Sequence, residues 1–211
     1  VRERGRRMKL AGERSPGGMA AVLKMDEGVV EEVCRQAREE TCRAVQIANY
    51  NAPGQIVISG DEPALARAIE LLKERGGRRI IPLAVSIAAH SPLMTAVMEE
   101  YRAAVDATPL HMPEVPVVAN IGARPLTTVA EIRDELAGQL IHPVRWTDSV
   151  HWMAQAGVTL FLEVGPKDVL SKLVQRIVPS AEAINVGSVE SVEGLRSALG
   201  AGDTEGVAHA L

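Results

Sequence analysis

His90 is the residue whose type and position best suit chemistry. It follows the apolar run Leu83–Ala89, and the pair Ser91-Pro92 behind it is typical of a helix start. A strand-like run that ends on a histidine places the imidazole at the carboxyl end of a strand, where open α/β sheets hold ligands. On residue type alone, a histidine in this position is more often structural than catalytic, so the assignment depends on other residues.

Familiar catalytic signatures are absent around this histidine. Ser91 is an improbable nucleophile for it, because neighbouring side chains on an extended backbone point to opposite sides. The 211 residues contain no G-x-S-x-G elbow, no Walker loop, no dinucleotide fingerprint and no H-E-x-x-H. The five histidines (His90, His111, His142, His151 and His209) do not fall at metal-ligand spacings, so we expect no metal site.

The composition excludes several classes of function. Hydrophobic residues make up 46% of the chain, enough for a packed core, whereas aromatic residues make up 2%, too few for stacking on bases. A formal charge of -4 offers nucleic acid no general attraction. There is no apolar run near the ~20 residues of a membrane span and no charged-then-apolar leader. Cys34 and Cys42 match no redox spacing, so we expect a cytoplasmic α/β protein.

The basic segment 1–11 has three interpretations: a nucleic-acid arm, a targeting peptide, or a helix that is already in progress at Val1. The missing helix-start signal favours the third interpretation. After the breaker cluster 15–18, turn signals and apolar periodicity predict six elements in the order βαββαβ, the ferredoxin-like plan. These are strand 19–25, a helix capped by Asp26, strands 44–49 and 55–59, a helix capped by Asp61, and strand 79–85, which Pro82 places at a sheet edge or a bulge.

The pattern changes after His90. The apolar periodicity predicts two buried strands, Val115–Asn120 and Val158–Val164, the second covered on both faces as in a parallel sheet. These are pieces of a sheet with helices on both sides, but too few strands to complete it. The remaining predicted elements are helices 92–107, 128–140, 143–157 and 169–178 and strand 183–186, followed by a weakly specified tail over 200–211.

Six groups of residues occur in the order of one enzyme family. They are Arg4-Gly5, NYNAPGQ at 49–55, 85–94 with His90 inside it, PVVAN at 116–120, 139–146 ending in PVRW, and EVGP at 163–166. Over about 1–198 the chain resembles the C-terminal two-thirds of malonyl-CoA:acyl carrier protein transacylases of bacterial fatty acid synthesis. It is also similar to the acyltransferase domains of polyketide synthases.

The resemblance implies a fold and an activity. The fold is a partial α/β-hydrolase-like large subdomain (1–16 and 86–199) with an inserted ferredoxin-like small subdomain (17–85), which agrees with the βαββαβ pattern. The activity is transfer of malonyl from coenzyme A to the phosphopantetheine thiol of acyl carrier protein through an acyl-serine. Malonyl-CoA and acyl carrier protein are the implied partners of a monomeric enzyme, and the coenzyme A thioester is a substrate, not a cofactor.

The resemblance also assigns roles to four residues. His90 matches the general base, Gln139 the residue whose backbone carbonyl orients the imidazole, and Arg4 the arginine that binds the malonyl carboxylate. Asn51 is expected to line the site. Each of the last three also has a plainer interpretation: Gln139 as a polar helix end, Arg4 as a solvated charge, and Asn51 as a turn residue.

Three positions depart from the family pattern. The G-H-S-x-G motif with the nucleophilic serine and the loop with part of the oxyanion hole are absent, so we expect this chain alone to be inactive. Ala89 stands where Phe or Ser is usual, which suggests weaker rejection of methyl-branched substrates. Lys167 stands where a glycine is common after Gly165-Pro166.

Two alternatives come from other functional classes. One is a non-catalytic ferredoxin-like module that binds a small metabolite, and the other is a degenerate acyltransferase kept for docking a carrier protein. Because acyl carrier protein is acidic, docking needs a local basic patch, for which Arg75, Arg78 and Arg79 are the candidates.

Overall fold

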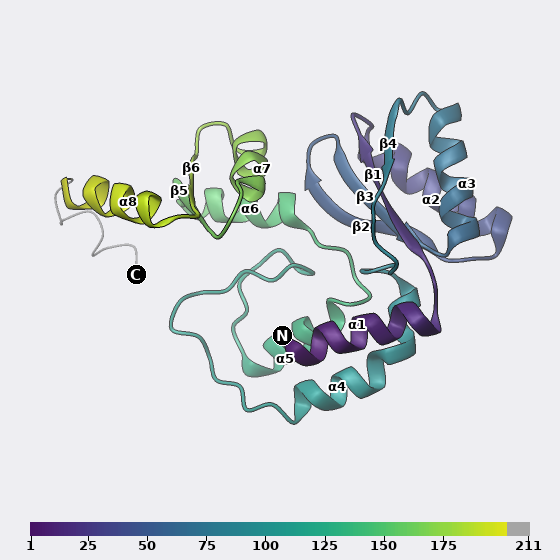
Figure 1. Ribbon diagram of the computed structural model, residues 1–211, viewed down its shortest axis with the longest axis horizontal. Helices are drawn as coiled ribbons and strands as arrows, with labels where there is room; N and C mark the ends of the chain where they lie inside the picture. The colour runs from purple at the N-terminus through teal and green to yellow at the C-terminus, as the bar shows by residue number, and fades with distance from the viewer. Residues whose placement is uncertain (202–211) are drawn as a thin grey trace. The chain divides into compact units, whose positions relative to one another are not determined.

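The computed structural model describes residues 1–201, with side chains as far as 196, and shows an α/β protein (Figure 1). It divides into two units, 1–149 and 150–211, which are described separately. The elements are α1 (Arg2–Arg14), β1 (Gly18–Leu23), α2 (Glu27–Thr41), β2 (Val45–Ala52), β3 (Gln55–Gly60), α3 (Glu62–Glu74), β4 (Arg79–Pro82), the 3-10 helix η1 (Pro92–Val97), α4 (Met98–Asp106), α5 (Val129–Gly138), α6 (Trp146–Gln155), β5 (Leu160–Val164), α7 (Val169–Ile177), β6 (Glu182–Val186) and α8 (Val189–Ala201).

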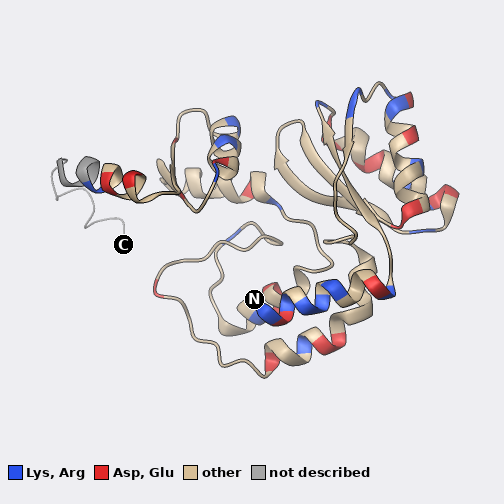
Figure 2. Cartoon of the chain, viewed as in Figure 1, with Lys and Arg blue, Asp and Glu red and all other residues tan. Residues whose placement is uncertain are grey.

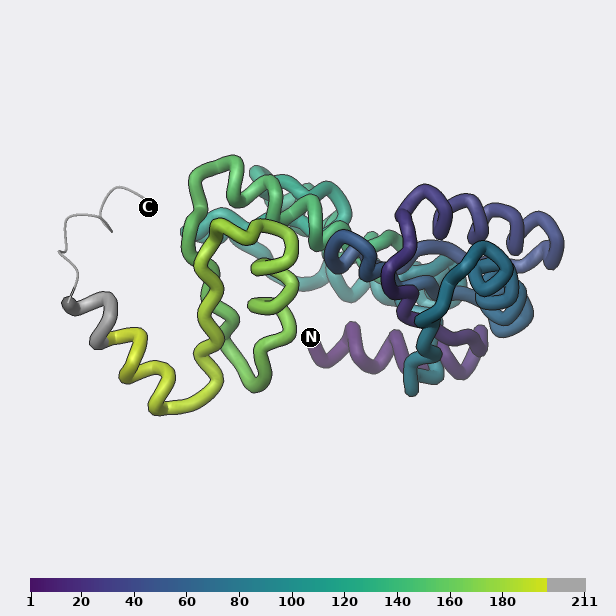
Figure 3. The backbone as a smooth tube through the Cα atoms, turned by 90° about the horizontal axis from the view of Figure 1, so that it is seen from above, coloured from purple at the N-terminus to yellow at the C-terminus, as the bar shows by residue number. Residues whose placement is uncertain are grey.

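The first unit contains a four-stranded antiparallel sheet in the order β2-β3-β1-β4. Its elements follow one another as βαββαβ, the order that the sequence predicts. Helices α2 and α3 lie side by side, as Figures 1 and 3 show from two directions. Their apolar stripes and the sheet form one core, in which Val22, Val30, Ile58 and Leu72 are almost fully buried.

Local signals account for most boundaries in this region. The Asp26 carboxylate accepts hydrogen bonds from the amides of Gly28 (2.9 Å) and Val29 (3.4 Å), which confirms the predicted cap of α2. Asp61 does precede α3, but its carboxylate makes no cap hydrogen bond and pairs with Arg43 at 3.3 Å. Strand β4 lies at the predicted edge and ends at Pro82, which has no N–H to continue the ladder.

A second apolar cluster connects the sheet to the segment before His90. Met19, Ala48 and Val57, from three different strands, pack with Ala89, which is 8% exposed. A third cluster joins α1, η1 and α4, with Ala11, Met94, Val97, Tyr101, Val105 and Leu140 as its buried members. The residue next to His90 is therefore part of a packed core.

One of the two predicted buried strands is wrong, and the other is a strand that is not buried. Residues 115–120 form no strand, and Val115 and Val117 are 61% and 46% exposed; the only ladder contact there is an isolated bridge from Val118 to Pro125. Pro116 has no backbone N–H to donate to a ladder, and the described residues offer the segment no partner strand, so its apolar side chains alone do not make it a strand. Strand β5 exists and pairs in parallel with β6, but Val164 is 83% exposed, so it is not covered on both faces.

The second unit is built around the β5–β6 pair and α7. The Glu163 carboxylate, at the end of β5, accepts hydrogen bonds from the amides of Leu170 (3.0 Å) and Ser171 (2.8 Å) and so caps α7. Lys167 has a φ of +71°, the left-handed region that favours glycine, and its carbonyl accepts a hydrogen bond from the Asn185 amide. The tail predicted over 200–211 lies outside the described residues, except that α8 extends to Ala201.

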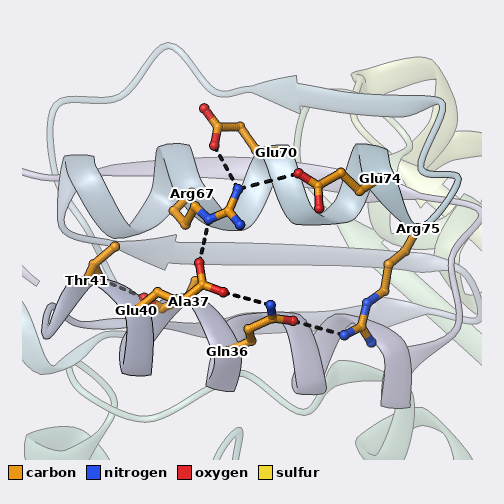
Figure 4. Close-up of polar contacts among 8 residues, drawn as sticks. All are labelled: Gln36, Ala37, Glu40, Thr41, Arg67, Glu70, Glu74 and Arg75. Carbon is orange, nitrogen blue, oxygen red and sulfur yellow. Dashed lines mark hydrogen bonds and ion pairs between the residues drawn. The ribbon is translucent and has the colours of Figure 1, made fainter.

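Charged residues lie mainly on the helices, and the strands carry few of them (Figure 2). Between α2 and α3 they form the network of Figure 4, in which Arg67 pairs with Glu40 (2.5 Å), Glu70 (3.0 Å) and Glu74 (3.5 Å). Gln36 extends it by accepting from Arg75 at 3.0 Å. In the described part of the chain no helix is long and apolar enough to cross a membrane.

Candidate active site

His90 lies in a turn, not at the end of a strand. The segment 83–89 is outside any strand, and His90 has a φ of +57°, which costs a residue other than glycine roughly 1–2 kcal/mol. The predicted helix start after it is present as η1. The Ser91 hydroxyl donates to the Ala88 carbonyl (2.7 Å) and accepts from the Leu93 amide (3.3 Å), so it is a buried structural group.

The His90 ring is held by two backbone carbonyls. Its Nδ1 lies 2.6 Å from the Gln139 oxygen and 3.1 Å from the His142 oxygen. Because a carbonyl can only accept, Nδ1 must carry the hydrogen, and in the neutral ring the lone pair is then on Nε2. No described residue forms a hydrogen bond with Nε2, so this nitrogen is free to take a proton.

The surroundings keep the imidazole neutral. Burial lowers the pKa of His90 from its ordinary value of 6.5, and the positive charge of Arg4 acts in the same direction. The two carbonyls oppose this by stabilising the imidazolium, but burial is the larger effect. A neutral ring with a free Nε2 is the form that a general base needs.

Gln139 is placed by the end of α5. That helix starts at the Thr128 cap, whose hydroxyl accepts from the Glu131 amide at 3.1 Å, and Gln139 is its last residue in helical conformation. The last carbonyls of a helix have no partner within the helix. The oxygen of Gln139 is one of these, and it meets His90 Nδ1.

Arg4 differs from its neighbours on α1. Arg6 and Arg7 lie 3.8 Å and 3.6 Å from Glu3, and Arg14 lies 3.1 Å from Glu100. The Nε atoms of Arg4 and Arg7 are both buried without a hydrogen-bond partner, but Arg7 has its ion pair with Glu3, whereas Arg4 has no ion pair with any described residue. A buried donor of this kind is costly unless a ligand or another chain segment satisfies it.

Two hollows lie beside residues of this region. One, of about 260 Å³, is lined by Glu3 and Arg4 of α1, by Thr108, and by residues of α4 and α5 that include Tyr101 and Leu136. The other, of about 310 Å³, is lined by Gln139, Glu135, Leu136 and the 117–120 segment. Neither includes His90, but both include Leu136, so Arg4 and Gln139 line adjoining space.

Asn51 is not brought into this group by any described contact. It occupies the irregularity in β2 between Tyr50 and Ala52, where the register with β3 shifts by one residue. No hydrogen bond or ion pair in the described structure joins it to His90, Gln139 or Arg4. The nearby polar contact is instead Thr147, whose hydroxyl donates to the Tyr50 carbonyl at 3.0 Å.

Glu135 is a site residue that the sequence interpretation missed. Its buried carboxylate accepts from the amides of Asn120 (2.9 Å) and Ile121 (3.4 Å) and from the Gln139 side chain (3.1 Å). It therefore fixes the PVVAN segment to the end of α5. The only available signal was the spacing of four residues between Glu135 and Gln139, which brings side chains together on a helix.

Gln46 on β2 was missed as well. Its Nε2 donates to the carbonyls of His90 (2.8 Å) and Ile141 (3.1 Å). These partners lie 44 and 95 residues away in the chain, and contacts over such separations leave no local pattern in the sequence.

The geometry combines an oriented neutral imidazole with an unpartnered guanidinium that acts on it electrostatically. The imidazole can move a proton to and from an incoming group, and the guanidinium can bind a carboxylate or a phosphate. No described side chain completes a nucleophile–histidine pair. In the described residues no group of three or more His, Cys, Asp or Glu side chains could hold a metal ion.

Comparison with known proteins supplies the family. A family model described as acyl transferase domain matches residues 1–198. The malonyl CoA-acyl carrier protein transacylase of Bacillus subtilis is 41% identical over 193 residues, which are 92% of this chain and 61% of that protein. The chain therefore spans less than two thirds of that relative.

Solved structures agree with this result. The malonyl-CoA:acyl carrier protein transacylase of Xanthomonas oryzae superposes with a TM-score of 0.89 at 42% identity, covering 94% of this chain and 62% of that one. A malonyl-transacylase solved in complex with a type II polyketide acyl carrier protein superposes with a TM-score of 0.86 at 32% identity, covering 92% and 62%.

Proposed function

This chain belongs to the acyl transferase domain family, and from that membership we propose that it forms the C-terminal two-thirds of a cytoplasmic malonyl-CoA:acyl carrier protein transacylase. The observation that carries the proposal is the His90 ring, whose Nδ1 is bound to the Gln139 carbonyl and whose Nε2 is free. We propose that 17–85 is a ferredoxin-like small subdomain inserted in an α/β-hydrolase-like large one, 1–16 and 86–199.

The proposed reaction has two half-reactions. His90 Nε2 takes the proton of a serine hydroxyl as its oxygen attacks the thioester carbonyl of malonyl-CoA, and returns the proton to the departing thiolate of coenzyme A. It then takes the proton of the phosphopantetheine thiol, whose sulfur attacks the acyl-serine, and returns it to the serine oxygen. The serine belongs to the part of the enzyme that these 211 residues do not contain, so this chain alone is inactive.

Arg4 gives the proposal its substrate class. A planar guanidinium binds a free carboxylate through two parallel hydrogen bonds, which selects malonyl over acetyl. The buried Nε of Arg4 supports this role because Arg4 has no ion pair with any described residue, whereas Arg7, whose Nε also lacks a hydrogen bond, lies 3.6 Å from Glu3. Asn51 remains a proposed lining residue of the same site.

The experiment joins residues 1–211 to the part of the B. subtilis transacylase that the match leaves uncovered, in which the family pattern places the serine. We expect this chimera to transfer malonyl to acyl carrier protein, and His90→Ala to lower kcat/KM by about 10²–10⁴-fold. Arg4→Lys should reduce the preference for malonyl-CoA over acetyl-CoA by roughly 10–100-fold. Folded chimeras that transfer nothing, or that keep their full rate with His90→Ala, would contradict the proposal.

Docking of an acidic carrier is proposed at Arg78 and Arg79, at the start of the edge strand β4. Both are exposed, whereas Arg75 is already bonded to Gln36 (Figure 4). In the chimera, Arg78→Glu and Arg79→Glu should each raise KM for the carrier and leave KM for malonyl-CoA unchanged. Lys9→Glu, at another exposed position, is the matched charge reversal.

Two further measurements use the same chimera. Fatty acid and polyketide carrier proteins are compared as acceptors of malonyl, and size-exclusion chromatography tests whether the enzyme is a monomer, as we propose.

A further inference from the structure

Gln46 connects the four-stranded sheet to the His90 turn through a single amide group. Its side-chain nitrogen carries two hydrogens, and there are two acceptors within reach, the His90 carbonyl at 2.8 Å and the Ile141 carbonyl at 3.1 Å. The group is partly buried, so water competes weakly for either carbonyl.

The two carbonyls that Gln46 binds lie on the two partners of the imidazole hydrogen bond, the donor residue His90 and the loop that contains its acceptors. One is on His90 itself, whose left-handed backbone conformation needs support from outside the residue. The other is on Ile141, between Gln139 and His142, whose oxygens accept the Nδ1 hydrogen. The Gln46 amide therefore binds both His90, which carries the imidazole, and the 139–142 loop, whose carbonyls accept the Nδ1 hydrogen.

The backbone of strand β2 also binds the loop that follows α5. The Tyr50 amide donates to the Val144 carbonyl at 2.9 Å, and the Val144 amide donates to the Ala48 carbonyl at 2.8 Å. The loop after α5 is thus paired with the backbone of β2 at Val144 and held by the Gln46 side chain at Ile141. Among the described residues His90 has no hydrogen bond to the β2 backbone, so the Gln46 side chain supplies the hydrogen-bonded link between that strand and the His90 turn, beside the apolar packing of Ala48 on Ala89.

We propose that Gln46 is a positioning residue that keeps His90 in the Nδ1–H tautomer with Nε2 available. The effect of Gln46 on catalysis rests on the proposed function. Its effect on the His90 tautomer does not, because the tautomer can be observed without any acyl transfer. The small subdomain would then take part in the chemistry by setting the form of the base.

The test is nitrogen NMR of the His90 ring in the 211-residue chain. In the wild type we expect one neutral tautomer and a slowly exchanging Nδ1 proton. In Gln46→Leu, exchange of that proton should become about five- to tenfold faster, the ratio that corresponds to loss of one hydrogen bond, and signal from the Nε2–H tautomer should appear. Gln46→Glu keeps the length of the side chain but loses both donors, and should behave in the same way near neutral pH.

Gln36→Leu is the matched control, because the Gln36 amide bonds Glu40 at 2.7 Å on the surface network and should leave the His90 signals unchanged. Two folded Gln46 variants with wild-type His90 signals would overturn the proposal. If the variants do not fold, the proposal is tested on the wild-type chain. Rapid exchange of the Gln46 side-chain amide protons with solvent would then overturn the proposal. The chimera separates the two proposals. If it transfers no malonyl while its His90 ring still keeps one tautomer, the result contradicts the proposed function and leaves the role of Gln46 intact.

Discussion

Ile58 in the four-stranded sheet is completely buried, whereas Leu162 in the two-stranded sheet is 44% exposed. Both are branched aliphatic residues within strands, so the side chain itself does not explain the difference. The four-stranded sheet has α2 and α3 on one face and the Ala89 cluster on its other face. In the second unit α7 contacts both β5 and β6, and the described residues cover less of the strands.

The comparison shows that an apolar strand is buried only where both of its faces receive a layer. It also locates the stable part of the chain, because the free energy gained from burial follows the apolar area removed from water. Residues 18–82 should carry most of the stability. His90, whose preceding residue packs on this sheet, is attached to the well-packed region.

The largest effect is expected from a matched pair of truncations. Leu72→Ala should lower the free energy of unfolding by about 2–5 kcal/mol, because Leu72 is fully buried and leaves a cavity. Leu162→Ala should lower it by less than about 1 kcal/mol, because its side chain is already in contact with water. Urea unfolding of the chain measures both, and equal losses would remove the distinction between the core that α3 forms with the four-stranded sheet and the two-stranded sheet.

A smaller effect is expected where the four-stranded sheet meets the His90 turn. Ala89→Phe should destabilise the chain by about 1–3 kcal/mol, because the new ring must enter the space occupied by Met19, Ala48 and Val57. Ala89→Ser, which adds little volume, serves as the control. If the phenylalanine variant unfolds at the same urea concentration as the wild type, the second face of the sheet is not closed.

Lys167→Gly should change stability in the opposite direction. Lys167 has a φ of +71°, which glycine adopts without a steric cost, so we expect a gain of about 0.5–1 kcal/mol. Lys172→Gly, in the interior of α7, should instead cost about 1 kcal/mol. Thermal unfolding of both variants shows whether the second unit contributes to the measured transition; no change in either would mean that it does not.

The smallest effect concerns His90 and pH. Its pKa is lower in the folded chain than the ordinary 6.5, so below 6.5 the unfolded chain binds more protons than the folded one. The free energy of unfolding should therefore fall as the pH is lowered from 6.5 through the folded pKa. His90→Gln should remove this contribution, measured as the difference between the pH profiles of the two proteins; superimposable profiles would contradict the buried neutral ring.

The sequence was most informative where the determinants are local. Asp26 and Thr128 predicted helix starts that the structure contains, and Pro82 predicted an edge strand. The order βαββαβ also followed from turn signals and periodicity. Boundaries were less accurate: the helix predicted from Pro92 begins as the 3-10 helix η1, and the strand predicted to reach Val85 ends at Pro82.

The site was predictable only where a motif marked it. Gln46 and Glu135 act through hydrogen bonds to backbone groups, and the identity of those groups depends on the folded chain. The left-handed conformation of His90 was missed because histidine adopts it rarely and the preceding apolar run suggested a strand. The apolar segment 115–120 was assigned as a strand because periodicity cannot show whether a partner strand is available.

The two edges of the four-stranded sheet have a consequence for aggregation. Exposed edge strands can add strands from other molecules. One edge, β2, is already paired with Val144, and the other, β4, is short, ends in a proline and begins with an arginine. Concentrated solutions and refolding mixtures should therefore not associate through this sheet, and intermolecular strand addition, where it occurs, should begin at the less protected β5–β6 pair.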